Sequence, residues 1–307
     1  MSSIVLLGAK SFIGEAIISH IDLYSSIKAV SHKSLPSNFD QHKNIAWYQA
    51  DLLAPNSLDS ILMEGDLVIN LAYIHNGSFK DNFFLLNNII NSCHQSGVRR
   101  LIHCSSIDVF GRTKDNFINE KTPCMPLSDY ERIKFDLEGI LKKNVLNTLD
   151  YGILRPAQVV GPGGRALTKL AWALKNSSWI SNYLRASLYG MRPMHLVSVR
   201  NVAKALVHLA TLGNNLNGNV YIVSSDEEEC NTFNRVEKCL ILALGLKKRK
   251  FPLIPFPEAI LSLILRLRGR SSYNIRKKYD SSKLMLTGFT KIDSVEDAIR
   301  AYADSSE

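Results

Sequence analysis

Residues 4–14 read IVLLGAKSFIG, an apolar run followed by two glycines six positions apart. Gly8 comes directly after a predicted strand, and Gly14 lies one turn into the predicted helix that follows. The first glycine permits a tight turn, and the last lets helix and strand pack closely. Backbone N–H groups at the start of such a helix can hold a pyrophosphate, helped by the helix dipole. The stretch therefore predicts a strand, a phosphate-binding turn and a helix.

Ser11 departs from this pattern, because a dinucleotide-binding turn usually has a third glycine in the middle. Its Cβ is expected where the chain approaches the phosphates, and its hydroxyl is expected to donate a hydrogen bond in exchange. Taken alone, the stretch fits a plain strand–turn–helix unit equally well. The rest of the chain has to decide between the two.

Short apolar runs alternate with amphipathic segments through the first two hundred residues. The predicted strands are 3–7, 26–31, 45–50, 66–72, 100–106 and 151–156, and the predicted helices are 12–21, 57–63, 79–96 and 129–142. Several strands are apolar at nearly every position, which is typical of parallel strands buried on both faces. The alternation predicts an α/β fold, a Rossmann-like doubly wound parallel sheet.

The alternation fades after Gly161, where a GPGG turn leads into a helix and later into a further strand at 219–224. We predict a dinucleotide-binding domain over residues 1–160 and a smaller, mainly substrate-binding lobe over 161–307. Late strands and helices of this lobe are expected to return to the sheet.

The composition is ordinary for a soluble enzyme, with 46% hydrophobic and 21% charged residues among 307. No apolar run approaches the roughly 20 residues that span a bilayer, and Gly8 and Lys10 interrupt any secretory signal. Five cysteines without a CxxC pair predict reduced thiols in a cytoplasmic protein and no metal site. The net charge of +9 indicates an anionic partner: a nucleotide, an acidic lipid surface or nucleic acid.

The stretch YERIK at 130–134 places Tyr130 and Lys134 four positions apart, on one face of a predicted helix. A lysine ammonium beside a phenol lowers the pKa of the phenol, which makes tyrosine an acid and base near neutral pH. A serine of CSSIDVFG (104–111) ends the preceding strand and can hydrogen-bond a substrate oxygen. Together these residues suit hydride transfer between a sugar or alcohol carbon and a nicotinamide. The bare YxxxK spacing also fits a chance pair on an exposed helix.

Several motifs occur in one order along nearly the whole chain. They are GAKSFIG (8–14), ADLL (50–53), VINLA (68–72), NNIINSCHQSGVRRLIHCSSIDVFG (87–111), ILRPAQVVGPGG (153–164) and DSSKLMLTGF (280–289). In this order they resemble the extended short-chain dehydrogenase/reductases, that is, the NAD-dependent epimerase/dehydratase family.

The resemblance implies catalytic roles for four residues. Tyr130 is the implied acid and base, and Lys134 lowers its pKa and holds the cofactor ribose. Counting back five from Gly111 makes Ser106, rather than Ser105, the catalytic hydroxyl. Asn82 corresponds to a helix asparagine that supports a water-linked proton relay, although helix capping or surface polarity is an open alternative for it and for Asn88.

The resemblance also implies the cofactor contacts. These residues are Gly8, Ser11, Phe12, Ile13, Gly14, His32, Lys33, Asp51, Leu52, Leu71, Ala72, Tyr130, Lys134 and Pro156. NAD-dependent enzymes commonly carry an acid at the end of the second strand, whereas this chain has Ser31, His32 and Lys33 there. A polar and basic strand end suits a 2′-phosphate, so the sequence favours NADP over NAD.

Two departures narrow the reaction. Ile107 follows Ser106 where family dehydratases carry an acid, which disfavours 4,6-dehydration. The stretch VRNVA (199–203) resembles members that act as nucleotide-sugar 4-epimerases or 4-ketoreductases.

Arg165 and Arg192 are candidates to bind the substrate diphosphate bidentately, with a surface salt bridge as the alternative.

The expected function is therefore an NAD(P)-dependent 4-epimerase or 4-ketoreductase of a nucleotide sugar. Two alternatives stay open: a reductase or dehydrogenase of a non-sugar ketone or sterol-like alcohol, and a catalytically silent NAD(P)-binding regulator. We expect no nucleic-acid partner, and we leave a homodimer open. The amphipathic segment 256–270 is expected either to pack against the carboxy-terminal lobe or to touch a membrane surface.

Overall fold

The computed structural model describes residues 3–19, 26–32, 44–145, 149–247, 249, 251–257, 260 and 276–305. Lys33 and most of the segment 256–270 lie outside the described residues, so the expectations for them stay predictions. None of the helices in the described ranges is long and apolar enough to cross a membrane.

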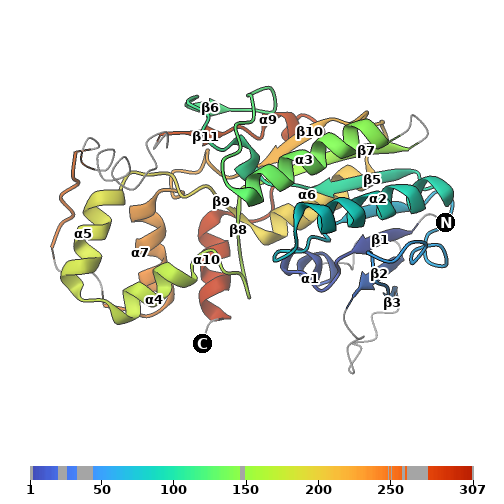
Figure 1. Cartoon of the computed structure of the whole chain (residues 1–307). Coiled ribbons are helices and arrows are strands. Elements are labelled where there is room, and N and C mark those ends of the chain that lie inside the picture. Colours follow the sequence, from blue (N-terminus) through green and yellow to red (C-terminus); the bar gives the residue numbers. More distant parts are fainter. Residues whose placement is uncertain are drawn as a thin grey trace. The chain divides into compact units, whose positions relative to one another are not determined.

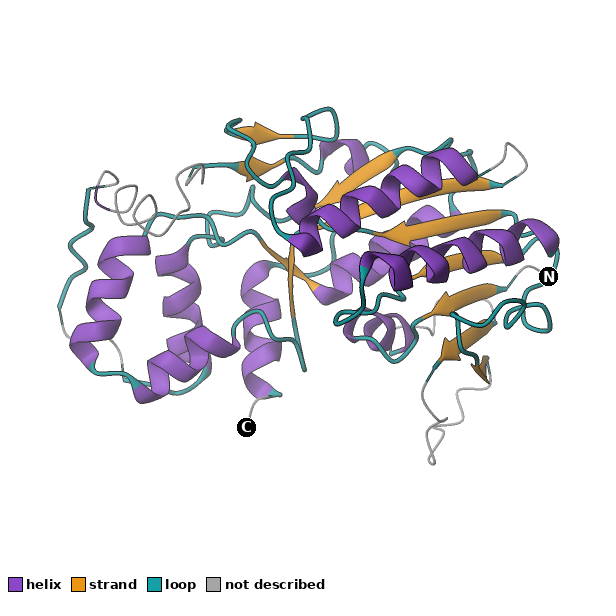
Figure 2. Cartoon of the chain, in the orientation of Figure 1, coloured by secondary structure: helices purple, strands orange, loops and turns teal. Residues whose placement is uncertain are grey.

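A sheet of seven described strands organises the fold, in the spatial order β10-β7-β5-β4-β1-β2-β3 (Figures 1 and 2). The strands are β1 (Ile4–Leu7), β2 (Ile27–Ser31), β3 (Ile45–Gln49), β4 (Leu67–Asn70), β5 (Arg100–Cys104), β7 (Asp150–Pro156) and β10 (Val220–Val223). Neighbouring strands pair in parallel from β3 to β7. The order reverses at β1, and the crevice at such a reversal is where doubly wound sheets bind ligands. The predicted Rossmann-like fold is confirmed.

Helices α2 (Phe79–Gln95) and α3 (Asp129–Asn144) lie side by side over one face of the sheet (Figure 2). Right-handed crossovers place α1 (Phe12–Ile18), which joins β1 to β2, on the opposite face. Both α2 and α3 begin with a capping box, Ser78 with Asp81 and Ser128 with Glu131. Each cap satisfies backbone donors that the first turn leaves open, typically worth about 1 kcal/mol.

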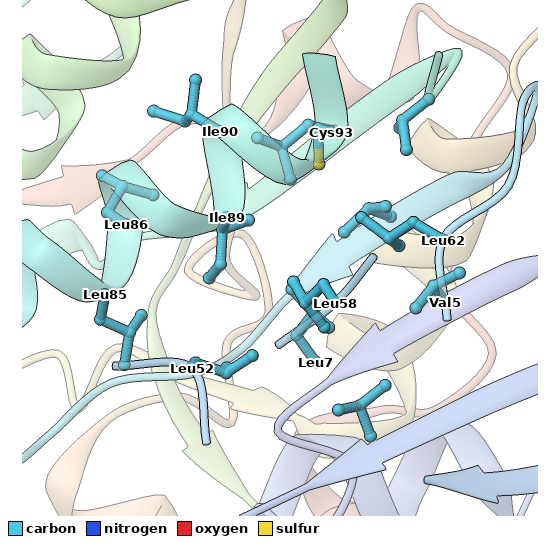
Figure 3. Packing of buried hydrophobic residues seen from close by; sticks show 14 of the residues in the cluster. Val5, Leu7, Leu52, Leu58, Leu62, Leu85, Leu86, Ile89, Ile90 and Cys93 are labelled. Carbon is cyan, nitrogen blue, oxygen red and sulfur yellow. The ribbon is translucent and has the colours of Figure 1, made fainter. Parts of the chain in front are cut away.

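The main core joins the sheet to α2. Figure 3 shows Leu85, Leu86, Ile89, Ile90 and Cys93 of α2 in one buried cluster with β1 and the 52–62 segment. Their spacing of three and four positions makes one apolar helix face. Burial of each large aliphatic side chain contributes about 1.5–3 kcal/mol, so this packing fixes where α2 begins beside the end of β4.

The predicted helix at 57–63 is wrong, because the structure has a series of turns there. Asn56 (φ 61°) and Gly65 (φ 81°) both have positive φ and bracket a stretch too short to repay helix nucleation. The expected apolar side is nevertheless buried, since Leu58, Ile61 and Leu62 are 1–4% exposed.

Arg100, at the start of β5, is 1% exposed and ties together distant parts of the chain. Its Nε donates to Asp150 at 2.6 Å, and its two Nη groups donate to the carbonyl oxygens of Leu209, Ala210, Leu212 and Asn214. These carbonyls belong to the end of α6 (Val199–Thr211) and the turn after it. A buried arginine thus closes a helix end that would otherwise leave its carbonyls open.

The chain divides into two compact units, each made of three segments. Unit 1 comprises 1–109, 127–155 and 203–221, and unit 2 comprises 110–126, 156–202 and 222–307. The units therefore do not follow a single cut at residue 160, because α6 and β10 return late to the sheet. The dinucleotide and substrate roles expected of the two parts stay predictions.

Unit 2 has its own core around α7 (Phe233–Ala243) and α10 (Val295–Asp304). Its other elements are the strand pairs β6 (Phe117–Ile118) with β11 (Lys278–Tyr279) and β8 (Gln158–Val160) with β9 (Leu196–Ser198), and the helices α4 (Thr168–Asn176), α5 (Trp179–Tyr189) and α9 (Ser282–Met285). Helix α5 packs against α7, and α10 packs against α7 and β9.

Candidate active site

Both glycines of the first turn are required by the backbone around them. Gly8 has φ +83°, and a Cβ there would lie 3.1 Å from the backbone nitrogen of Ala72. A Cβ on Gly14 would lie 2.5 Å from the carbonyl oxygen of Ala9, closer than real Cβ contacts come. The first glycine therefore makes the turn and the second allows α1 to approach the strand, as the sequence predicts.

Ser11 does not need to be glycine. Its φ of −78° suits any residue, and it is the N-cap of α1, with Oγ accepting a hydrogen bond from Gly14 N at 3.1 Å. An oxygen that accepts this bond still has its own hydrogen to donate. The expected bond from this hydroxyl to a phosphate stays a prediction. Phe12 and Ile13 form the first turn of the helix behind it.

A pocket of about 430 Å³ opens at the carboxyl ends of β1 to β4. Its lining comprises Gly8, Val30, Ser31, His32, Ala50, Asp51, Leu52, Leu53, Ala72, Tyr73, Ile74 and Leu85. Five of these were predicted as cofactor contacts: Gly8, His32, Asp51, Leu52 and Ala72. Tyr73 and Ile74 were missed, although they directly follow the predicted fourth strand. Leu71 is next to the lining, and Pro156 belongs to unit 2.

Hydrogen bonds hold the turn that contains Asp51 and Leu52 in place. Asp51 Oδ1 accepts a hydrogen bond from Leu53 N at 3.0 Å and lies 3.8 Å from His32 Nδ1. Asn88 of α2 donates to the carbonyl oxygens of Leu52 and Leu53, at 3.1 and 3.0 Å. Asn88 thus holds the turn at the pocket rim. This role differs from both alternatives considered for it, helix capping and surface polarity.

Ser106, Tyr130 and Lys134 come together at the end of β5 and the start of α3. Ser106 hydrogen-bonds Tyr130 through their side chains, and Ser106 Oγ accepts from Asp108 N at 3.1 Å. Ser105 instead donates its hydroxyl to Glu138 at 2.6 Å. The serine beside Tyr130 is therefore Ser106, the one that counting back from Gly111 selects. Tyr130 is 37% exposed and accessible to a substrate.

The expectation that Lys134 lowers the pKa of Tyr130 stays a prediction. Burial, followed by the nearby Asp108 carboxylate, raises the pKa of Tyr130 well above 10. Lys134 is itself buried, which lowers its pKa, and its Nζ donates to the carbonyl oxygen of Cys104 at 3.2 Å. The ammonium also lies 4.3 Å from the centre of the Tyr73 ring, whose edge contacts Tyr130. Lys134 is thus turned toward Cys104 and Tyr73.

A buried ion pair that the sequence analysis missed lies behind these residues. Glu138 and Arg155 are 1% and 3% exposed and bond through two hydrogen bonds, at 2.6 and 3.0 Å. Glu138 stands one helical turn after Lys134, and Arg155 lies in the ILRP stretch of β7. The sequence signal that could have indicated this ion pair is the position of Glu138, four residues after Lys134 on the same helix.

Asn82 is almost fully buried, so surface polarity is the wrong description of it. Its Oδ1 accepts from Ile74 N at 2.9 Å, and its Nδ2 donates to the carbonyl oxygens of Ile74 and Ser78. The side chain thereby holds the loop between β4 and α2 against the helix. A part in a proton relay stays a prediction.

His103 and Cys104 are core residues, as expected, at 2% and 8% exposed. Burial lowers the pKa of His103 to about 3, so the ring is neutral. Asn70 Nδ2 donates to His103 Nδ1 at 3.2 Å, while Asn70 Oδ1 accepts from Ala72 N. The Asn70 side chain thus links the end of β4, where the pocket begins, to the neighbouring strand β5.

Arg165 and Arg192 belong to unit 2. Arg165 is exposed after the GPGG turn, and Arg192 lies with its guanidinium 6.0 Å from the centre of the Tyr189 ring. Their expected contact with a substrate diphosphate stays a prediction.

Comparisons with known proteins agree with this geometry. The profile of the NAD dependent epimerase/dehydratase family matches residues 4–224. An uncharacterized protein of Sinorhizobium fredii is 28% identical over 156 residues, 48% of this chain and 38% of that protein. Sterol demethylase protein B of Methylococcus capsulatus is 34% identical over 77 residues, 24% of either chain. The matches thus span well under half the length of these relatives.

Two solved structures share the fold over nearly the whole chain. The UDP-N-acetylglucosamine 4-epimerase of Methanobrevibacter ruminantium has a TM-score of 0.71 and 21% identity, with 99% of this chain and 98% of that one covered. The UDP-glucuronic acid 4-epimerase of Bacillus cereus, in complex with NAD, has a TM-score of 0.75 and 18% identity, with 99% and 96% covered. From the family match and the glycine turn, we conclude that the chain belongs to the NAD-dependent epimerase/dehydratase family.

Proposed function

We propose that this protein is an NAD(P)-dependent enzyme that acts at C4 of a nucleotide-activated sugar, by 4-epimerisation or 4-keto reduction. The observation that carries the proposal is the cluster of Ser106, Tyr130 and Lys134 in the same compact unit as the glycine turn and its pocket. Similar folds named as 4-epimerases of UDP-sugars support a nucleotide sugar as substrate. Ile107 beside Ser106 argues against dehydration, since its side chain cannot exchange a proton.

The pocket suits the adenosine half of the cofactor. It is largely apolar, with Asp51 and His32 as polar groups at the rim, which is the usual make-up of a small-molecule site. The first turn of α1 offers backbone N–H groups to the pyrophosphate. When bound, the nicotinamide supplies the chemistry of accepting a hydride from a sugar carbon or returning it.

Tyr130 is the residue that we assign to proton transfer. In keto reduction, its neutral phenol donates a proton to the C4 oxygen, and the raised pKa keeps the phenol protonated near neutral pH. Oxidation requires the deprotonated phenolate, which takes the proton of the C4 hydroxyl. The positive end of the α3 helix dipole stabilises this anion because Tyr130 lies in the first turn of α3. Ser106 hydrogen-bonds the same substrate oxygen and orients it. Lys134 holds the cofactor ribose.

Arg165 and Arg192 are the residues that we assign to the substrate diphosphate. A guanidinium pairs bidentately with phosphate, and the stretch 151–225 contains no Asp or Glu to compete for it. For the cofactor, we favour NADP, because β2 ends in Ser31 and His32 without a carboxylate. The Bacillus cereus structure, which contains NAD, makes NAD the competing choice.

The partial match to sterol demethylase protein B favours one second candidate, a reductase of a non-sugar ketone or alcohol. The same Ser106, Tyr130 and Lys134 would serve that reaction, because only the carbon skeleton carrying the oxygen differs. A catalytically silent regulator fits less well, since it has no use for this cluster.

A homodimer through α2 and α3 is part of the proposal. A groove of about 400 Å³ lies between these helices and is lined by Phe79, Phe83 and Phe135 among others. Phe79, Phe84 and Phe135 are exposed beside it. Phe84→Glu should convert a dimer to a monomer, as measured by light scattering after gel filtration.

The deciding experiment is incubation of the purified full chain with UDP-sugars in the presence of NAD, and with a UDP-4-keto sugar or a sterol ketone in the presence of NADPH or NADH. Proton NMR follows the configuration at C4, and absorbance at the reduced-nicotinamide band follows net reduction. A C4 epimer or a reduced 4-keto sugar supports the proposal. Turnover of the sterol ketone alone moves the assignment to the second candidate, and cofactor binding without turnover points to the regulator.

A further inference from the structure

Large apolar side chains are exposed on α5 and on the segment 251–257 of unit 2. Trp179 is 66% exposed, Phe251 59% and Ile254 67%, and Ile180 and Leu184 are also exposed. We call these five residues the α5 apolar surface. Single exposed apolar residues are ordinary, but a group that includes Trp and Phe marks an interaction site.

The segment 251–257 runs along α5 (Figure 1), which brings the apolar residues of the two elements to the same part of unit 2. The rings of Trp179 and Phe251 have centroids 6.1 Å apart. Tyr183 Oη donates to the carbonyl oxygen of Pro252 at 3.0 Å and accepts from Ile254 N at 3.2 Å. Phe256 N donates to the carbonyl oxygen of Ser187 at 2.9 Å.

The backbone of this segment suits contact with an apolar phase. Pro252, Pro255 and Pro257 have no N–H, and the N–H groups of Ile254 and Phe256 are already bonded. Backbone donors that are absent or satisfied avoid the penalty of leaving water. The exposed side chains can therefore enter a less polar environment without stranding these donors.

The sequence around this surface is rich in basic residues. Residues 156–198, which include α4 and α5, contain five Arg and Lys and no Asp or Glu. Residues 244–257 add four more, at 247–250, of which Arg249 pairs with Glu237. Lys175 and Lys247 are exposed. A second copy docked through the same face would bring these positive charges together, which disfavours a contact between copies.

We infer that the α5 apolar surface docks the protein reversibly on an anionic lipid bilayer. Trp and Phe side chains bury their rings at the boundary between headgroups and acyl chains. Exposed lysines of the same unit, such as Lys175 and Lys247, extend their ammonium groups to the lipid phosphates. The inference is independent of the proposed reaction, because none of these residues lies in the candidate active site.

The test is flotation of the full chain with vesicles of phosphatidylcholine alone or mixed with phosphatidylglycerol. The parent should float with the mixed vesicles and bind the neutral ones at least about tenfold more weakly. The double variant Trp179→Ser/Phe251→Ser should lose about tenfold or more of the binding. Lys175→Glu/Lys247→Glu should lose about 25-fold or more, since each lysine contributes roughly fivefold.

Matched controls change exposed residues elsewhere: Leu286→Ser, at a side chain 87% exposed, and Lys80→Glu on α2. Both should bind as the parent does, and circular dichroism melting should be unchanged in all variants because every changed residue is exposed. Absence of flotation with mixed vesicles overturns the inference, as does equal loss in the controls. Self-association without lipid that disappears in Trp179→Ser/Phe251→Ser would assign the surface to a contact between copies and also overturn it.

Discussion

Glu138 and Arg155 form a bidentate ion pair that is almost completely buried, with Nε donating to Oε1 at 3.0 Å and Nη2 to Oε2 at 2.6 Å. Ser105 donates to the same Oε1 at 2.6 Å. The pair thus links α3, the end of β5 and β7 directly behind Ser106 and Lys134. It sets the distance between the strand that carries the serine and the helix that carries the tyrosine.

Removing one charge of this pair should be more harmful than removing both. Glu138→Gln leaves Arg155 buried without a counter-charge, and we expect a loss of about 3 kcal/mol in the free energy of unfolding. Glu138→Leu/Arg155→Met should lose less, since neither charge remains. Urea unfolding of the three proteins measures this, and a double variant that is the least stable of them would contradict the pairing.

Tyr130→Phe should lower turnover by roughly a hundredfold or more while cofactor affinity changes little. The substitution removes the hydroxyl that exchanges the proton and keeps the ring that contacts Tyr73. Steady-state kinetics and NADPH fluorescence titration give the two quantities. Turnover within a few fold of the parent would remove Tyr130 from the mechanism.

Gly14→Ala should destabilise the protein and abolish cofactor binding, because the new Cβ would lie 2.5 Å from a backbone oxygen. Gly139→Ala is the matched control: the same change within α3 meets nothing within 4 Å and should stabilise by about 0.5–1 kcal/mol.

Ser11→Gly should keep the fold and the affinity, while Ser11→Leu should abolish binding by displacing the phosphates. Thermal unfolding and cofactor titration measure these effects, and unchanged affinity in Ser11→Leu would refute the phosphate-binding turn.

His103 should make the fold sensitive to acid. Burial lowers its folded-state pKa to about 3, below the unfolded value of about 6.5. Between these values the unfolded chain binds the extra proton, so stability falls as the pH falls, by about 1.4 kcal/mol per pH unit from this group. His103→Gln should flatten the decline between pH 6 and 4 in urea unfolding. The exposed His32→Gln should not, and an equal slope in the parent and His103→Gln would contradict the assignment.

The cofactor preference can be measured directly. We expect NADPH to bind more tightly than NADH, because Ser31 ends β2 and His32 follows it, at the place where a carboxylate would repel a 2′-phosphate. His32→Asp should reverse the preference, with a loss of NADPH affinity of about tenfold or more. Parallel fluorescence titrations of both cofactors decide it. Equal affinities in the parent would make the tightly held NAD of an epimerase the better description.

Much of the sheet could be predicted because most strands are short runs dominated by apolar residues, such as Ile4–Leu7 and Val220–Val223. The glycine positions followed from local turn geometry, and Tyr130 and Lys134 from spacing on one helix. The helix predicted at 57–63 was wrong. The spacing of its apolar residues indicated correctly which side is buried, but it could not show that the stretch is too short to form a helix.

Contacts between distant residues could not be predicted. Glu138 and Arg155 lie on different elements, and only the folded chain shows that they meet. Asn82 and Asn88 read as polar positions on a helix, whereas the structure uses their amides to hold loops at 74–78 and 52–53. The raised pKa of Tyr130 likewise arises from burial, which no spacing rule reports.

The partners of Arg100 have a consequence for how the protein is made. The ribosome adds more than a hundred residues after Arg100 before the carbonyls of residues 209–214 exist, which at ~5–20 residues per second takes about 5–20 s. Throughout that interval the first strands of unit 1 have emerged without their closing helix and edge strand. Unit 1 therefore cannot be completed until residues 203–221 have been made, and the segments 110–126 and 156–202 of unit 2 are translated before that point. The amino-terminal strands of the nascent chain consequently wait for their last packing partners while part of the other unit is already being made.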